Sequence, residues 1–220
     1  MLIYKNKKPR IANNSKPEEK TSKNKENKTM IFQLAAMLIL ICFYVFYIAK
    51  ILMQKKQSIE TNQMGKGNKP TKVLLNERIM SVATILAIVA EVISIFVTKT
   101  YLPTGLRITG MIIGVCAVSI FAAATITMKN SWRVGIPEEK TELITNGIYG
   151  ISRNPAFVAF DLLYLAICLL FFNIPLLIIS TWAAVMLHIQ ILQEEVHMHS
   201  MFGEDYTQYK KHTRRYLGRK

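Results

Sequence analysis

Cysteine, glycine and proline are all scarce in this 220-residue chain, which has 3 cysteines, 10 glycines and 7 prolines. The cysteines, Cys42, Cys116 and Cys168, are too few and too scattered for a disulfide framework or a four-ligand zinc site. Each lies in an apolar run, where a thiol behaves as a small hydrophobic group. Together with 51% hydrophobic residues, the low glycine and proline content excludes collagen-like and low-complexity scaffolds and disorder over most of the chain.

Acidic residues are also scarce relative to basic ones. The 14 Asp and Glu residues are outnumbered by 28 Lys and Arg residues, and the net charge is +14. A nucleic-acid-binding protein would need a folded basic face or a recognition motif, and the sequence has neither. The basic residues instead flank long apolar runs. We therefore expect anionic lipid headgroups as their partners, and no nucleic acid.

Five long apolar runs divide the chain. Residues 30–49 contain 20 consecutive residues without a charge, which as a helix would span about 30 Å, the thickness of the hydrocarbon core of a bilayer. The remaining runs are 79–98, 108–128, 156–172 and 174–192. They predict an all-α polytopic membrane protein with about five transmembrane helices, in which the last two runs form a tight hairpin.

The segments between these runs suggest how the chain is organised. We expect residues 1–29 to be a basic disordered tail, because no helical or strand period is visible there. The other expected parts are the first transmembrane helix at 30–49, a cytoplasmic loop at 50–78, the second and third transmembrane helices within 79–128, and a catalytic core at 129–220 containing the hairpin 156–192.

The distribution of basic residues predicts the orientation in the membrane. Segments 50–78, 129–155 and 193–220 must share one side, and they carry 17 Lys and Arg residues. The N-terminal tail and the turn at 99–107 share the other side and carry 11. The positive-inside rule places the first group in the cytoplasm. We also hypothesise that translation begins at Met30, which would sharpen the contrast to 17 against 2.

Two polar segments on the predicted cytoplasmic side contain recognisable motifs. The stretch Asn146-Gly147-Ile148-Tyr149 and the stretch Ser152-Arg153-Asn154-Pro155-Ala156-Phe157 resemble the G-x-Y…R-H-P-x-Y signature of isoprenylcysteine carboxyl methyltransferases and the related phospholipid methyltransferases. Glu194-Glu195, followed by Phe202-Gly203-Glu204-Asp205-Tyr206 and Tyr209, is similar to the E-E…F-G-x-x-Y-x-x-Y ending of that family. The resemblance covers about residues 129–217, and the five-span plan fits its small prokaryotic members.

The resemblance implies a methyltransferase of a prokaryotic plasma membrane that binds S-adenosylmethionine in a cytoplasmic pocket closed by the C-terminal segment. A lipophilic acceptor would enter from the bilayer between helices. The residues that the resemblance assigns to the cofactor are Thr141, Glu142, Leu143, Ile144, Tyr149, Asn154, Pro155, Ala156, Phe157, Glu194, Tyr206 and Tyr209. No metal ion is expected, because the Glu194-x-x-His197 spacing of a di-iron motif has no second copy.

The acceptor stays open at this stage, although we expect an O-methyltransferase. Methyl transfer is an in-line displacement, so the enzyme mainly aligns the reactants and excludes water. A carboxylate acceptor needs no general base, and Arg153 would orient it as a catalytic and substrate-binding residue. An amine or hydroxyl acceptor would instead pass its proton to Glu195. Asp161 and Gln190 are the other candidate substrate contacts.

Several residues depart from the family pattern, which leaves other functions open. Asn154 replaces the usual histidine, Phe157 the usual tyrosine, and Gln190 an arginine linked to substrate binding. These departures weaken the case for a prenylcysteine substrate. The alternatives are an NADPH-dependent membrane reductase of the sterol-reductase type and a non-catalytic membrane scaffold or lipid-binding protein.

Overall fold

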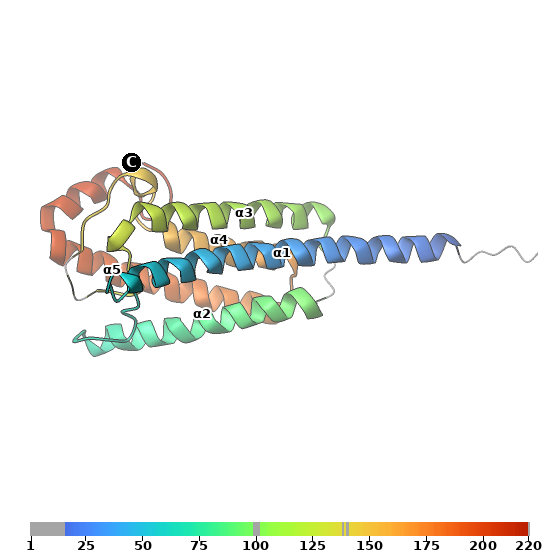
Figure 1. The fold of residues 1–220 in the computed structure, drawn as a ribbon, viewed down its shortest axis with the longest axis horizontal. Helices are drawn as coiled ribbons and strands as arrows, with labels where there is room; N and C mark the ends of the chain where they lie inside the picture. The colour runs from blue at the N-terminus through green and yellow to red at the C-terminus, as the bar shows by residue number, and fades with distance from the viewer. Residues whose placement is uncertain (1–15, 99–101, 138, 140, 220) are drawn as a thin grey trace, which may run out of the picture.

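The computed structural model describes residues 16–98, 102–137, 139 and 141–219, with side chains from residue 26 onward. This part of the chain is all-helical, as predicted, and its five α-helices lie side by side along the long axis of the molecule (Figure 1). The α-helices are α1 (Lys16–Lys56), α2 (Thr71–Val97), α3 (Thr104–Thr127), α4 (Pro155–Leu170) and α5 (Ile174–His212). Two short 3-10 helices, η1 (Lys129–Ser131) and η2 (Gly147–Gly150), lie between α3 and α4.

Four of these helices, α1, α2, α3 and α5, are long and apolar enough to cross a membrane. Helix α4 is also apolar but has only 16 residues, a length of about 24 Å. Helix α5 is longer than a bilayer needs. Its apolar part, residues 174–192, would span about 29 Å, and the remainder extends beyond the membrane-spanning part. The predicted polytopic membrane fold is therefore confirmed.

Helix α1 corrects two of the predicted boundaries. It begins at Lys16, so residues 16–29 are helical and not a disordered tail, whereas residues 1–15 lie outside the described residues. Proline at position 17, followed by two glutamates, is a favourable start for a helix. Helix α1 also continues to Lys56, so the loop before α2 spans 57–70 instead of 50–78. In Figure 1 the N-terminal part of α1 projects beyond the other helices.

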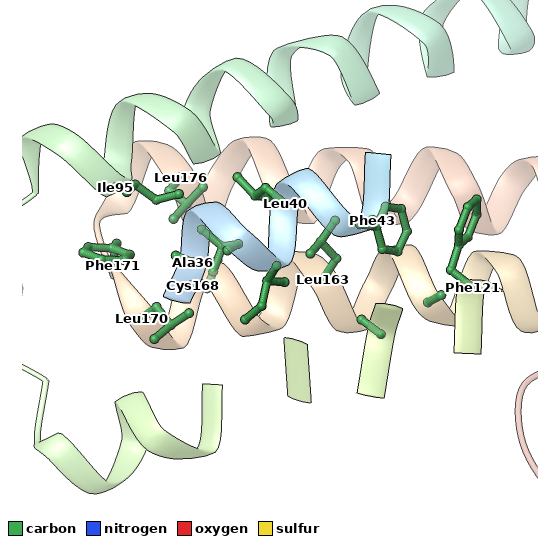
Figure 2. Close-up of a cluster of buried hydrophobic side chains, with 14 of the residues drawn as sticks. Ala36, Leu40, Phe43, Ile95, Phe121, Leu163, Cys168, Leu170, Phe171 and Leu176 are labelled. Atoms are coloured by element: carbon green, nitrogen blue, oxygen red, sulfur yellow. The ribbon is translucent and has the colours of Figure 1, made fainter. Parts of the chain in front are cut away.

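The core lies between α1, α3 and α4. Phe43 of α1 stacks on Phe121 of α3 with ring centroids 4.4 Å apart, and both side chains are fully buried (Figure 2). Helices α3 and α4 approach closely at Gly110, where an added Cβ would lie 2.9 Å from the carbonyl oxygen of Ala166. Gly114, one turn further, makes similar room for Ile39 of α1. The two glycines thus allow the close helix contact that small residues permit in membrane proteins.

A second cluster joins α2 to α5. Met80 and Ala83 of α2 pack with Met186 and Leu187 of α5. Near the start of α3, Arg107 is buried, and its Cζ lies 3.9 Å from the centroid of the Phe32 ring. The first cluster thus holds α1 against α3 and α4, and the second holds α2 against α5.

Candidate functional site

A cavity of about 610 Å³ lies at the end of the bundle where α1 ends and α2 begins. This volume is within the usual range for sites that bind small molecules and cofactors. All five α-helices, the loop at 57–70 and the segment between α3 and α4 contribute to its wall, which is mostly apolar and rich in aromatic rings. The aromatic residues that line it are Tyr44, Tyr47, Phe121, Trp132, Tyr149, Phe157, Phe160, Tyr206 and Tyr209.

The structure brings most of the predicted site residues to this one cavity. Those that line it are Thr141, Glu142, Ile144, Tyr149, Arg153, Asn154, Pro155, Ala156, Phe157, Glu194, Glu195, Tyr206 and Tyr209. Leu143 does not line it and faces a separate surface groove. Asp161 and Gln190 are also absent from the wall, but the Nε2 atom of Gln190 donates a hydrogen bond to Glu194 at 3.0 Å.

Arg153 is held by two partners from distant parts of the chain. Its Nη2 atom donates to Oε1 of Glu195 at 2.5 Å, and its Nη1 atom donates to the carbonyl oxygen of Thr213 at 2.8 Å. The side chains of Arg153 and Glu195 are only 4% and 8% exposed. The guanidinium therefore links α5 to the segment that follows it, and only its Nε has no hydrogen-bond partner among the described residues.

Glu195 is bound by a second arginine. The Nε and Nη2 atoms of Arg215 donate to its two carboxylate oxygens, each at 2.9 Å. Burial would raise the pKa of Glu195, but the hydrogen bonds and charges of Arg215 and Arg153 outweigh it and lower the pKa to about 2. A carboxylate with this pKa is a weak proton acceptor at neutral pH. The geometry thus favours a structural role for Glu195 over that of a general base.

Glu194 has a different environment, although it is the next residue on α5. Its hydrogen bond comes from a neutral amide, that of Gln190, and no salt bridge joins it to a described residue. Burial raises the pKa of Glu194 to about 7. A cavity acid with a pKa close to neutrality can bind a cation in its ionised form and can also accept a proton. Of the two glutamates, Glu194 is therefore the better candidate for binding a cation or accepting a proton.

The C-terminal segment covers the cavity after a sharp bend in α5. Gly203 has a φ of 50° and interrupts the helical geometry, so the last turns fold back (Figure 1). The hydroxyl group of Tyr209 then donates to the carbonyl oxygen of Tyr149 at 2.6 Å. Beyond the helix, the Nδ2 atom of Asn154 donates to the carbonyl oxygen of Arg215 at 3.1 Å. The two motif segments are thus bonded directly to each other.

One wall of the cavity was not predicted from the sequence. It consists of Asn62 and Met64 from the loop before α2, together with Met80 and Thr84 from α2. A buried ion pair between Lys69 and Glu77 lies beside this wall. In sequence, a lysine and a glutamate on either side of a helix start are typical of a solvent-exposed surface, so the pattern contained no signal of a buried site.

These features define a class of protein: a polytopic helical membrane protein with a small-molecule cavity at one end of its bundle. Residues 105–205 match the family model of phospholipid methyltransferases, which confirms the resemblance predicted from the motifs. Over these residues the chain is similar to phospholipid methyltransferases. The match extends from the start of α3 to just past the Gly203 bend, so it contains both glutamates and Arg153. No curated protein matches the chain.

Proposed function

We propose that this protein transfers a methyl group from S-adenosylmethionine to a lipophilic acceptor, at the cytoplasmic face of the membrane. The observation that carries the proposal is the aromatic cavity itself, which Glu194 and Arg153 line from within the region that matches the family. S-adenosylmethionine contains a sulfonium, an ammonium group and a flat adenine. The residues present suit all three groups.

Three kinds of side chain would hold the cofactor. Aromatic faces, such as those of Trp132 and Tyr47, can contact the adenine and attract the sulfonium through cation–π interactions. Ionised Glu194 can bind the ammonium group, and Gln190, which lies behind the cavity wall, orients Glu194 through a hydrogen bond from its amide. When bound, S-adenosylmethionine supplies the electrophilic methyl group. The folded-back C-terminal segment would exclude water from the reaction.

The arginines of the cavity bear on the choice of acceptor. Arg153 is engaged by Glu195 and Thr213, and Arg133 donates to the carbonyl oxygens of Asn130 and Trp132. Both guanidinium groups already face a carboxylate, Glu195 at 2.5 Å from Arg153 and Glu139 at 3.9 Å from Arg133, which weakens their attraction for a second one. An amine or hydroxyl acceptor fits this geometry better, with Glu194 in place of Glu195 as the proton acceptor.

The position of the wall supports entry of the acceptor from the bilayer. Ile48 of α1 and Ile85 of α2 line the cavity, yet they are 53% and 56% exposed on the outer surface of the bundle. Both lie in membrane-spanning helices. An apolar chain could therefore pass between α1 and α2 while its polar head reaches Glu194.

Calorimetry on the detergent-solubilised protein tests this proposal. S-adenosylmethionine and S-adenosylhomocysteine should bind, and NADPH should not. Glu194→Gln should weaken binding of S-adenosylmethionine about tenfold, because it removes the charge that faces the ammonium group. Glu204→Gln is the matched control, since Glu204 is exposed and lies after the bend. Failure of both adenosyl ligands to bind would overturn the proposal, and binding of NADPH alone would favour the reductase alternative.

A further inference from the structure

Glu77, in the second turn of α2, is fully buried and has no part in the chemistry described above. Its Oε2 atom accepts a hydrogen bond from the backbone N–H of Gly65 at 2.7 Å, and its Oε1 atom accepts one from Ile136 at 2.9 Å. The Nζ atom of Lys69 donates to both oxygens, at 2.8 and 2.9 Å, and also to the carbonyl oxygen of Gln63 at 2.7 Å. The pair is therefore buried and well bonded, which is the condition for it to be stable.

These bonds join two separate segments of the cavity wall. Gly65 belongs to the loop between α1 and α2, and Ile136 belongs to the segment that follows η1. At Gly135, which has a φ of +86°, an added Cβ would lie 2.9 Å from the backbone nitrogen of Met64 and 3.1 Å from Oε1 of Glu77. Both Met64 and Gly135 line the cavity. The ion pair thus sits where two wall segments approach each other as closely as the backbone permits.

The same ion pair influences Glu194 electrostatically, across the contact between α2 and α5. Helices α2 and α5 run antiparallel, and Met80, one turn after Glu77, packs with Leu187 of α5. After burial and the hydrogen bond from Gln190, the negative charge of Glu77 raises the pKa of Glu194 and the positive charge of Lys69 lowers it. Tyr149 of η2 is also in electrostatic contact with Glu194. His197, three residues further along α5, has its pKa lowered by burial and by the charge of Lys69.

We propose that Lys69 and Glu77 are positioning residues of the methyltransferase site: they hold the wall formed by the two loops and set the charge that Glu194 presents to a cationic ligand. This inference rests on the proposed function, since it takes the ligand to be an organic sulfonium or ammonium ion. It also assigns a functional role to a part of the chain that lies outside residues 105–205, which match the family.

The proposal predicts that substitutions of Lys69 and of Glu77 shift the pH dependence of S-adenosylmethionine binding in opposite directions. Ionised Glu194 attracts a cation, so the affinity for S-adenosylmethionine should rise as the pH increases through about 7. Lys69→Met removes a positive charge that favours the ionised form of Glu194. The pH midpoint of S-adenosylmethionine binding should therefore move up by about half a pH unit or more. Glu77→Gln removes a charge that opposes the ionised form, and the midpoint should move down by a similar amount. In the double variant the two effects should largely cancel.

The experiment is a calorimetric titration with S-adenosylmethionine from about pH 5.5 to 8.5, with thermal unfolding measured on each variant. Lys66→Met is the matched control, because Lys66 lies in the same loop and pairs with Glu60 on the surface. It should leave the midpoint unchanged. A purely structural role for the pair would change the affinity without moving the midpoint in opposite directions, and that result would overturn the proposal.

Lys69→Arg covers the case in which the single neutral variants do not fold. It keeps the positive charge and changes the shape of the side chain, so the affinity should fall while the midpoint stays in place. A displaced midpoint in this variant contradicts the proposal. The two hypotheses can also fail separately. If the parent protein binds no adenosyl ligand, the proposed function is wrong, whereas normal binding with midpoints that do not respond to Lys69 or Glu77 refutes only this inference.

Discussion

Arg153 shows that a residue of the motif also holds separate parts of the fold together. Its position in the sequence suggested a guanidinium that orients the acceptor. In the structure both terminal nitrogens are used, one by Glu195 and one by the backbone of Thr213, 60 residues away. The residue therefore acts as a latch between α5 and the C-terminal segment that covers the cavity.

The latch leads to a prediction for Arg153→Ala. Glu195 would keep Arg215, but the buried carbonyl oxygen of Thr213 would lose its partner, which destabilises the docked segment by about 1–3 kcal/mol. We expect faster proteolysis of residues 213–219 and weaker binding of S-adenosylmethionine, with the helical bundle intact by circular dichroism. Arg214→Ala is the control, because Arg214 is exposed in the same segment. Equal protease resistance of the two variants would contradict the latch.

At the scale of elements, the bend in α5 is the feature that forms the cover. A straight helix of 39 residues would extend about 58 Å and leave the cavity open. The bend occurs at Gly203, whose φ of 50° and ψ of −118° are readily adopted only by glycine. Nothing lies within 4 Å of a Cβ added there. The requirement for glycine at this position is thus one of backbone conformation and not of space.

Gly203→Ala should therefore destabilise the cover through backbone strain, by about 1–2 kcal/mol. The matched control is Gly105→Ala near the start of α3, where an added Cβ also has nothing within 4 Å but the backbone is not in the left-handed region. Hydrogen exchange of residues 204–212 should increase in the first variant and stay unchanged in the second. An unchanged rate in Gly203→Ala would show that the bend is not dictated by this residue.

Helix ends were predicted less well than helix cores, and α1 illustrates the reason. The charged residues after Lys16 have no hydrophobic period, so the sequence pattern favoured a disordered tail, yet they continue the helix. Similarly, Lys50, Lys55 and Lys56 were assigned to a loop although they belong to the last turns of α1. Apolar patterning reports which residues are in lipid or in the core. It does not report where a regular backbone ends.

At the scale of the whole molecule, the cavity lies at the end of the bundle that carries most of the loop charge. The loop at 57–70, the segment that contains η1 and η2, and the C-terminal residues all meet there. The positive-inside rule predicts that this end faces the cytoplasm.

This orientation can be tested by labelling introduced cysteines with a membrane-impermeant maleimide. Lys66→Cys should react only from the cytoplasmic side and Gly105→Cys only from the opposite side, because the two exposed positions lie at opposite ends of the bundle. The parent protein is the control for its three native cysteines, all within helices. Labelling of Lys66→Cys from outside would reverse the orientation and remove the cavity from its proposed compartment.

The sequence by itself determined the class of this protein and the motif residues that line the cavity. Long apolar runs are a local property that lipid requires of any spanning helix, and the motif letters around Arg153 and Glu194 are likewise local. Only the tertiary structure decided what those residues do. Glu194 and Glu195 are adjacent and chemically identical, but two arginines reach one of them and a neutral amide reaches the other. The identity of partners that approach across space sets the charge of a carboxylate, and no pattern along the chain encodes it.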